Sequence, residues 1–385
     1  MSLIKHHLHY FSYRLSREVE EVYWHTLLNN LALSMVFIFE PIFLYTRGYS
    51  LVQIMWFYVQ VYVWYVILIG FGAKFAGKYG YKHAIFVSNI FYIIYWLILF
   101  SVDKNTALFF IAPIFFALQK SWFWPAYDAD IALSTAKVQE GREVGVLLSL
   151  VQAGFVAGPF LGGLLAHKFG FSALFVCASL LLLFSVYPLF RSPDIHSRHK
   201  FRYKNLWDIM KALPQNFFGY FGYAEDLMVM SLWPIYIFLI LPNVFGVGLM
   251  TTVATALGTV LMLYIGKLTD KIDKRKLIQL TSLFYAVTWL FRFLAKSVPS
   301  VLAIDSAHKT GKDISSVPIL ALTFERAGSR GPDYAIAYSV FYEFSLAVGK
   351  IVTALLVIWM LTAGLSIYLV FAVVGLMTLM YGLLK

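Results

Sequence analysis

Long apolar runs separated by short charged segments dominate the pattern of this 385-residue chain. About twenty residues without charge are long enough to cross the hydrocarbon core of a bilayer as one helix. The runs therefore predict an all-α membrane protein with twelve transmembrane helices. We expect these spans near residues 22–45, 51–75, 83–101, 105–133, 143–166, 171–190, 216–241, 246–268, 277–295, 299–326, 334–361 and 364–384.

Three landmarks in the first half of the chain recur at one fixed spacing in the second half. At an offset of 193 residues, AKFAGKYGYK (73–82) aligns with GKLTDKIDKR (266–275), EPIFLY (40–45) with WPIYIF (233–238), and Pro125 with Pro318. Such a repeat predicts an internal duplication of six helices, an architecture that many transporters use. We therefore expect two pseudo-symmetric six-helix bundles, at residues 1–190 and 216–385, joined by a basic cytoplasmic linker at residues 191–215.

Composition excludes most soluble classes of protein. Of all residues, 60% are hydrophobic, 18% are aromatic and only 13% are charged, which is far from the balance of a soluble domain. The net charge of +11 does not indicate a nucleic-acid partner, because the basic residues lie mostly between spans and form no face of a soluble fold. The single cysteine, Cys177, lies in an apolar run; it predicts packing and rules out a disulfide framework.

The distribution of Lys and Arg predicts the orientation in the membrane. The segments that share a side with the amino terminus hold 22 of them, and the opposite loops hold four (Arg47, Lys104, Lys168 and Lys296). The positive-inside rule then places both termini in the cytoplasm. We expect an integral protein of a bacterial inner membrane, with the basic linker attracted to anionic lipid headgroups.

The charged segment GKLTDKIDKRK, at residues 266–276, resembles the short loop signature of the major facilitator superfamily. In that family the loop is cytoplasmic and joins the second and third helices of each six-helix half. The resemblance rests on Gly266, Asp270, Lys271, Arg275 and Lys276, and the first copy departs from it because Gly77 stands where the second has Asp270.

The resemblance implies a mechanical role for this loop. In the family, the acid lies against a helix amino terminus of the other half when the cytoplasmic side is shut, where a negative charge is favoured. We therefore assign Asp270, Lys271 and Arg275 to a conformational latch. Asp270→Asn is expected to shift the population toward the inward-open form more than Gly77→Asp shifts it either way.

Small residues in the fifth span form a second signature. Gly145, Gly154, Gly158, Pro159, Gly162 and Gly163 resemble a motif in the fifth helix of proton-linked antiporters of the superfamily. Glycines at this spacing let two helix backbones approach closely, and a proline bends the helix. One explanation of this motif is close packing alone. The other is that Gly158 and Pro159 also take part in the conformational latch.

Ionisable residues inside spans are costly and usually face a wet cavity or one another. Most of those in this chain fall in the first, fourth, seventh and tenth spans: Glu40; Lys120, Asp128 and Asp130; Glu225 and Asp226; and Asp305, His308, Lys309, Lys312 and Asp313. The resemblance implies that these four helices line a central cavity.

The tenth span has acids and bases four residues apart, so that neighbours lie on one side of a helix and can neutralise each other. Asp305 and Lys309 are explained equally well by such pairing alone. Lys120 and Asp313 lie 193 residues apart, at equivalent places in the two halves, and two opposite charges there could hold a charged or zwitterionic solute. As solute-binding candidates we take Lys120, Trp124, Asp128, Lys312 and Asp313.

Three buried carboxylates are candidates for proton coupling: Glu40, Glu225 and Asp226. A low-dielectric site disfavours the charged form, so such a group can take up and release a proton. For each of them, a bond to a neighbouring lysine is an equally good explanation.

Motifs for enzyme chemistry or metal binding are missing from the sequence: it has no H-E-x-x-H, no G-x-S-x-G, no phosphate-binding loop and no cysteine pair. We therefore expect no enzyme, no cofactor and no metal. The predicted function is proton-coupled secondary transport of a small polar or charged organic solute by a monomer with alternating access. A multidrug antiporter is the alternative within transport, and a sensor or scaffold without net transport is the alternative outside it.

Overall fold

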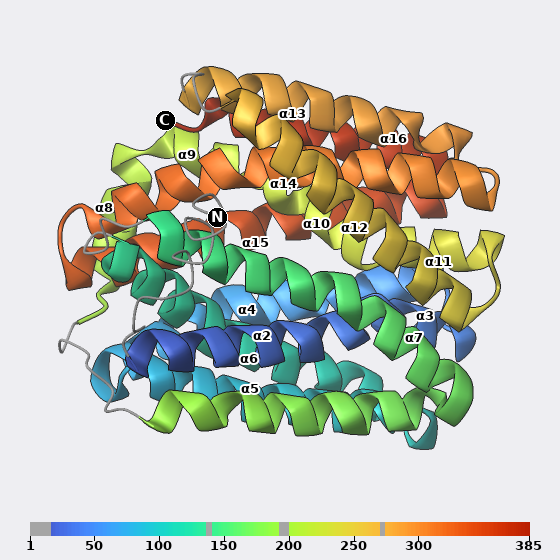
Figure 1. The fold of residues 1–385 in the computed structure, drawn as a ribbon, viewed down its shortest axis with the longest axis horizontal. Coiled ribbons are helices and arrows are strands. Elements are labelled where there is room, and N and C mark those ends of the chain that lie inside the picture. Colours follow the sequence, from blue (N-terminus) through green and yellow to red (C-terminus); the bar gives the residue numbers. More distant parts are fainter. Residues whose placement is uncertain (1–16, 136–140, 192–199, 270–273) are drawn as a thin grey trace, which may run out of the picture.

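The computed structural model describes residues 17–135, 141–191, 200–269 and 274–385, and every regular element in these ranges is a helix. Figure 1 shows long helices that run roughly along one direction, with the blue-to-green helices on one side and most of the yellow-to-red ones on the other. The prediction of an all-α protein is confirmed.

The first part of the chain forms six α-helices and two short 3-10 turns. They are α2 (Arg17–Phe37), α3 (Phe39–Thr46), α4 (Leu51–Tyr79), α5 (Tyr81–Phe100), η1 (Val102–Lys104), α6 (Ala107–Thr135), α7 (Gly141–Val186) and η2 (Tyr187–Arg191). Gly170 interrupts α7 with a φ of 80°, a left-handed conformation that glycine adopts without steric cost. Two helical segments therefore meet at this residue.

The second part begins with the short helix α8 (Tyr203–Ala212) in the predicted linker. After it come α9 (Pro214–Gly219), η3 (Tyr220–Ala224), α10 (Glu225–Met230), α11 (Leu232–Ile240), α12 (Val244–Thr269), α13 (Lys274–Leu290), η4 (Phe291–Leu294), α14 (Val298–Gly328), α15 (Pro332–Thr362), α16 (Ile367–Met377) and η5 (Thr378–Leu383).

Nine helical segments in the described residues are long and apolar enough to cross a membrane. The segment 149–191 among them contains the break at Gly170. Helix α14 is not among the nine, since it carries the charged residues of the tenth predicted span, and Ile367–Leu383 is a shorter apolar helix. Apolar side chains also cover the outside, where Phe184, Val260 and Trp359 are 64%, 65% and 61% exposed. An outer surface of this kind suits lipid.

Two helices break four residues before a proline. Helix α2 ends at Phe37, four before Pro41, and α10 ends at Met230, four before Pro234. Proline has no N–H to donate to the carbonyl four residues earlier, so the helical hydrogen bonding is interrupted at that carbonyl. The two breaks are 193 residues apart, the spacing that the sequence predicts.

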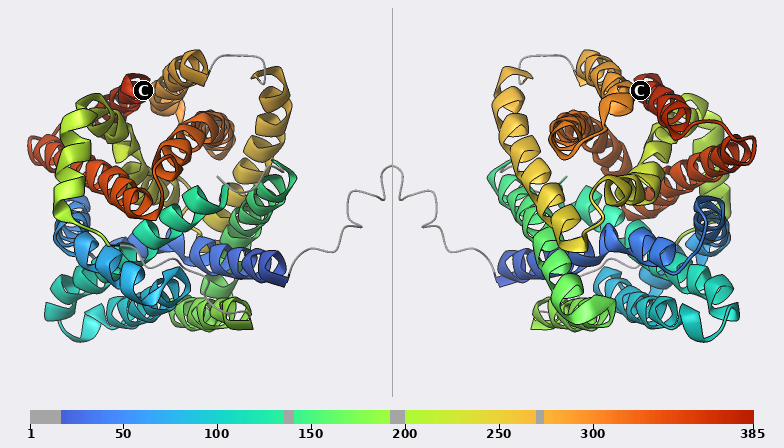
Figure 2. Two further views of the ribbon diagram at one scale, coloured as in Figure 1. Left: turned by 90° about the vertical axis from the view of Figure 1, so that its left-hand side faces the viewer. Right: turned by 90° about the vertical axis from the view of Figure 1, so that its right-hand side faces the viewer.

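The two parts of the chain touch along α7. Seen along the helices in Figure 2, the first segment of α7 lies between α2 and α12. Glycines make both contacts close: a Cβ on Gly162 would lie 2.0 Å from the Met35 carbonyl oxygen of α2, and one on Gly248 of α12 would lie 2.3 Å from that of Pro159. The backbones therefore meet with no side chain between them.

Candidate functional site

A cavity of about 290 Å³ lies where α2, α7, α10, α11, α12 and α14 meet. All of its ionisable lining residues come from α14, and three aromatic side chains form another part of its wall. The lining includes Ser34, Phe37, Gln152, Phe155, Pro159, Trp233, Thr251, Thr255, Asp305, His308, Lys309, Lys312 and Asp313. The cavity thus has a charged side on one helix and an aromatic side on others.

Helix α14 carries its charges into the bundle in bonded pairs. Lys309 Nζ lies 2.8 Å from Asp305 Oδ2, one helical turn away, and donates to the Thr251 carbonyl of α12 at 3.1 Å. The Trp233 indole donates to Asp305 Oδ1 at 2.8 Å. Residues four apart on a helix lie on one face, so the spacing by itself produces this pair.

Lys312 joins α14 to α10. Its ammonium lies 3.3 Å from Glu225 Oε1 and also contacts Asp226 Oδ1. Lys350 of α15 lies 3.7 Å from the other oxygen of Asp226. Glu225 is fully buried, and a buried carboxylate needs such a partner. Glu225 and Asp226, two of the three proton-coupling candidates, therefore have the neighbouring lysine that the alternative explanation requires.

Asp313 also lines the cavity from α14, and Gln152 of α7 lines the same cavity. Among the described residues no cation lies within ion-pair distance of the Asp313 carboxylate. Unlike Asp305, Asp313 is therefore a cavity carboxylate without an ion-pair partner in the described part of the chain. A positively charged group of a solute could bind there without displacing a lysine.

Lys120 and Trp124 of α6 do not line this cavity. The Lys120 ammonium lies 4.6 Å from the ring centroid of Phe116 and 5.7 Å from that of Tyr62, and Lys350 approaches the same Tyr62 ring at 5.2 Å. These are cation–π contacts, which stabilise a desolvated ammonium. The Trp124 ring packs near Phe123, at 5.1 Å between centroids.

Asp128 also lies outside the cavity, between α6 and α15. It is 4% exposed, and its Oδ2 has no hydrogen-bond partner among the described residues. The structure therefore groups the five predicted solute-binding residues in two places, with Lys312 and Asp313 at the cavity and Lys120, Trp124 and Asp128 along α6.

Glu40 of α3 is buried against α5. Its Oε1 accepts from the Trp96 indole at 2.7 Å, and its Oε2 accepts from the Tyr95 hydroxyl at 3.2 Å. It does not line the cavity, and its partners are an indole and a phenol, not a lysine.

The predicted latch residues lie in different regions. Gly158 packs on α2, where a Cβ would lie 1.9 Å from Ser34 Oγ, and Pro159 lines the cavity. Arg275 is exposed near the start of α13. Asp270 and Lys271 lie outside the described residues.

Arg292 of η4 was not singled out from the sequence, although it is a basic residue in an apolar run. It is fully buried, and none of its three side-chain nitrogens has a hydrogen-bond partner among the described residues. The guanidinium carbon lies 3.5 Å from the Trp289 ring centroid and 4.0 Å from that of Trp233. Gln152 and Trp233 line the cavity from distant elements, and no pattern in the sequence indicates that they do so.

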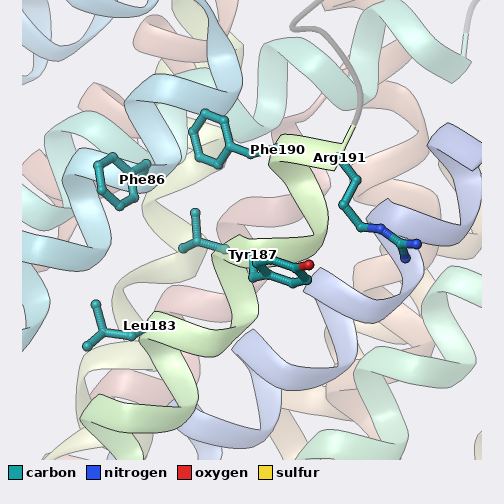
Figure 3. Close-up of a pocket in the computed structure, with 6 residues that line it drawn as sticks. Phe86, Leu183, Tyr187, Phe190 and Arg191 are labelled. Atoms are coloured by element: carbon teal, nitrogen blue, oxygen red, sulfur yellow. The ribbon is translucent and has the colours of Figure 1, made fainter.

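A second cavity, of about 380 Å³, lies on the outside near α5 and η2. Figure 3 shows the rings of Phe86, Tyr187 and Phe190 beside it, with Arg191 pointing away from Phe86. None of the predicted site residues lines it. In the described ranges, no group of three or more His, Cys, Asp or Glu side chains could hold a metal ion.

Long apolar helices, an apolar outer surface and a charged cavity between helices define an integral membrane protein of the helical-bundle class. Comparison with known families agrees: the family model of the Major Facilitator Superfamily matches residues 23–304, which is more than half of the chain. The protein therefore belongs to the major facilitator superfamily, as the loop and glycine signatures predict.

One characterised relative is "Multidrug resistance protein 2" of Bacillus subtilis (strain 168). It is 24% identical over 228 residues, which cover 54% of this chain and 56% of that protein. The match thus spans little more than half the length of each.

Proposed function

We propose that this protein is a secondary transporter that moves a small polar or charged organic solute by rocker-switch alternating access, coupled to protons. The observation that carries the proposal is the charged cavity between α7 and α14, which Gln152 lines from α7 and Asp313 from α14. A charged cavity at a contact between helices from the two parts of the chain suits a site that opens to either side in turn.

We propose twelve transmembrane helices in two pseudo-symmetric bundles, residues 1–190 and 216–385. Twelve follows from the nine apolar segments when the break at Gly170 divides one of them and when α14 and the segment 367–383 also cross. The charges on α14 do not oppose this, because Asp305 and Lys309 are bonded to each other and Lys312 is bonded to α10.

The proposed location is a bacterial inner membrane, with both termini in the cytoplasm. The basic loops on the amino-terminal side support this orientation, and the Bacillus relative supports a bacterial source. We propose that the protein works as a monomer among membrane lipids, without catalytic residues, cofactor, metal or nucleic acid.

The cavity supports two solute classes. Lys309, Lys312 and Asp313 favour a polar solute with charged groups. The rings of Phe37, Phe155 and Trp233, together with the printed name of the Bacillus relative, favour the alternative, a multidrug or toxic-compound proton antiporter. Aromatic faces bind organic cations by cation–π contact.

Transport into liposomes that contain the purified protein tests the function. We would impose a pH gradient and follow ethidium, as an aromatic cation, and radiolabelled lysine, as a polar charged solute. At least one should show protein-dependent flux that collapses with the gradient. If Asp313 contacts the solute, Asp313→Asn should lower that flux by about tenfold or more, which corresponds to about 1.4 kcal/mol.

Asp333→Asn is the matched control, because Asp333 is an exposed carboxylate at the start of α15. It should leave the flux unchanged. A protein that binds either probe, as measured by a thermal shift, but shows no flux would instead be a sensor or scaffold.

A further inference from the structure

The second cavity, on the outside of the bundle, combines an apolar wall with one cation. Its volume is about 380 Å³, within the range of pockets that hold small organic molecules, roughly 300 to 1,000 Å³. Arg191 points away from Phe86 in Figure 3, so the charge lies apart from the aromatic wall. The lining residues of this outer cavity are Phe86, Leu183, Val186, Tyr187, Phe190 and Arg191.

The aromatic wall joins the end of the sixth predicted span to the start of the third. Helix α7 ends at Val186, and the chain continues as the 3-10 turn η2. In this turn the Phe190 ring lies edge-on to α5, with its centroid 5.4 Å from that of His83 and 5.7 Å from that of Phe86. Edge-on ring pairs at such distances are favourable, so the wall is part of the packing of η2 on α5.

An exposed apolar stripe leads away from the outer cavity along α7. Val176, Leu180, Leu183 and Tyr187 follow at intervals of four, three and four residues, which places them on one face of the helix. They are 52%, 49%, 48% and 73% exposed, respectively. The stripe is about 16 Å long at 1.5 Å per residue, and one leaflet makes up half of a hydrocarbon core about 30 Å thick. It therefore matches one acyl chain of a single leaflet.

The cation lies where the apolar stripe ends. Arg191 is the last residue of η2 and is exposed, and in the described part of the chain no carboxylate lies within ion-pair distance of it. A guanidinium binds phosphate through two parallel hydrogen bonds. A cation next to an apolar stripe has the same order as the phosphate and the acyl chain of a phospholipid.

We propose that the outer cavity binds one anionic phospholipid of the cytoplasmic leaflet, with its phosphate at Arg191 and an acyl chain along the stripe from Tyr187 to Val176. The cytoplasmic leaflet carries anionic lipids, which attract basic residues at the membrane surface. A zwitterionic headgroup suits the site less well, because its own cation lies close to the phosphate and to Arg191. The binding does not depend on the proposed transport, and only the choice of leaflet rests on the proposed orientation.

Native mass spectrometry of the purified protein tests the headgroup preference. The protein would be titrated with phosphatidylglycerol, which is anionic, and with phosphatidylcholine of the same acyl chains. The first phosphatidylglycerol should bind more tightly than phosphatidylcholine. Arg191→Gln should weaken it about fivefold, the factor that corresponds to about 1 kcal/mol for one basic residue at an anionic surface, and should leave phosphatidylcholine unchanged.

Arg330→Gln is the matched control, because Arg330 is also exposed and lies 4.9 Å from the ring centroid of Tyr334, outside the outer cavity. It should bind both lipids as the wild type does. Equal affinity of the wild type and Arg191→Gln for phosphatidylglycerol would overturn the proposal. A dimer that forms in place of the lipid complex would also overturn it, because the occupant would then be a second copy of the chain.

Photo-crosslinking separates a defined site from general lipid contact. Phosphatidylglycerol with a diazirine on one acyl chain should label the stretch 176–190 more strongly than other lipid-facing helices, and Arg191→Gln should lower that labelling about fivefold at limiting lipid. Labelling spread evenly over the outer helices would refute the site.

The leaflet is tested separately. A cysteine introduced by Arg191→Cys, in a chain that also carries Cys177→Ser, should resist a membrane-impermeant maleimide in intact cells and react after the cells are opened. Reaction in intact cells would place Arg191 on the outer side and overturn the choice of leaflet, while the mass measurements would still decide the lipid binding.

Discussion

Trp96 and Trp289, which lie 193 positions apart, contact opposite charges in the two parts of the chain. In the first part of the chain, Glu40 accepts a hydrogen bond from the indole N–H of Trp96. In the second part, Trp233 stands at the position of Glu40 and Trp289 at that of Trp96, and the Arg292 guanidinium lies over both rings.

The difference follows from the charge distribution of an indole. Its edge, with the N–H group, is positive, and its face is negative. Trp96 presents its edge to an anion, whereas Trp289 presents its face to a cation. One residue type at equivalent positions can therefore stabilise either sign, and the repeat fixes the placement of the rings without fixing the charge.

The same contrast separates α6 from α14, which end 193 residues apart at Thr135 and Gly328. Asp305, Lys309 and Lys312 of α14 are bonded at or beside the cavity, while Lys120 on α6 is held by rings. The charged side of the cavity is thus a property of the second part alone.

The largest expected effect is on Lys312 in α14. Lys312→Met would leave the fully buried carboxylate of Glu225 without its cation, while the partly exposed Asp226 keeps Lys350. The loss of the Glu225 partner should cost about 3 to 5 kcal/mol of stability. Gln119 is the matched position in α6, 193 residues earlier, and it is buried and neutral. Gln119→Met should cost much less. Thermal unfolding of the purified variants measures both, and equal losses would refute the contrast between α6 and α14.

A smaller loss is expected at Glu40. Glu40→Ala would leave the Trp96 N–H and the Tyr95 hydroxyl buried without an acceptor, at a cost of about 1 to 3 kcal/mol for each group left unsatisfied. Glu40→Gln keeps an acceptor oxygen and should recover part of the stability. The comparison of the two unfolding midpoints is the measurement, and a Gln variant no more stable than Ala would contradict the hydrogen-bond explanation.

The smallest effect is expected at Arg292. Arg292→Met removes a buried charge that has no hydrogen-bond partner among the described residues and places a thioether against the rings of Trp233 and Trp289. Replacing a buried charge by an apolar group of similar size is often neutral or stabilising, so stability should stay within about 1 kcal/mol of the wild type or rise. A strongly destabilised variant would show that the guanidinium stabilises the fold by more than its contacts with the two tryptophan rings.

Much of the fold could be predicted from apolar length and from the repeat. The spans expected at 105–133 and 299–326 correspond to α6 (Ala107–Thr135) and α14 (Val298–Gly328). The first span instead breaks before Pro41. The repeated proline is visible in the sequence, but an apolar run predicts only the length of a span and not a break within it.

The site could be predicted less well, for a physical reason. Spacing along one helix gave the Asp305–Lys309 pair, since both residues belong to α14. Lys312 is bonded to residues of α10, and Gln152 of α7 lines the cavity beside Asp313. No periodicity in a single helix reveals such neighbours. The contacts of Arg292 cannot be predicted from the sequence for the same reason, because its partners are ring faces on three different elements.

The glycine contact between α7 and α12 has a mechanical consequence. Helices whose side chains interlock must change rotamers to tilt against each other, whereas two bare backbones can roll with little rearrangement. Gly248 closely approaches Pro159 beside the cavity, so under the proposed alternating access this contact is a place where α7 and α12 can rotate against each other without rotamer changes.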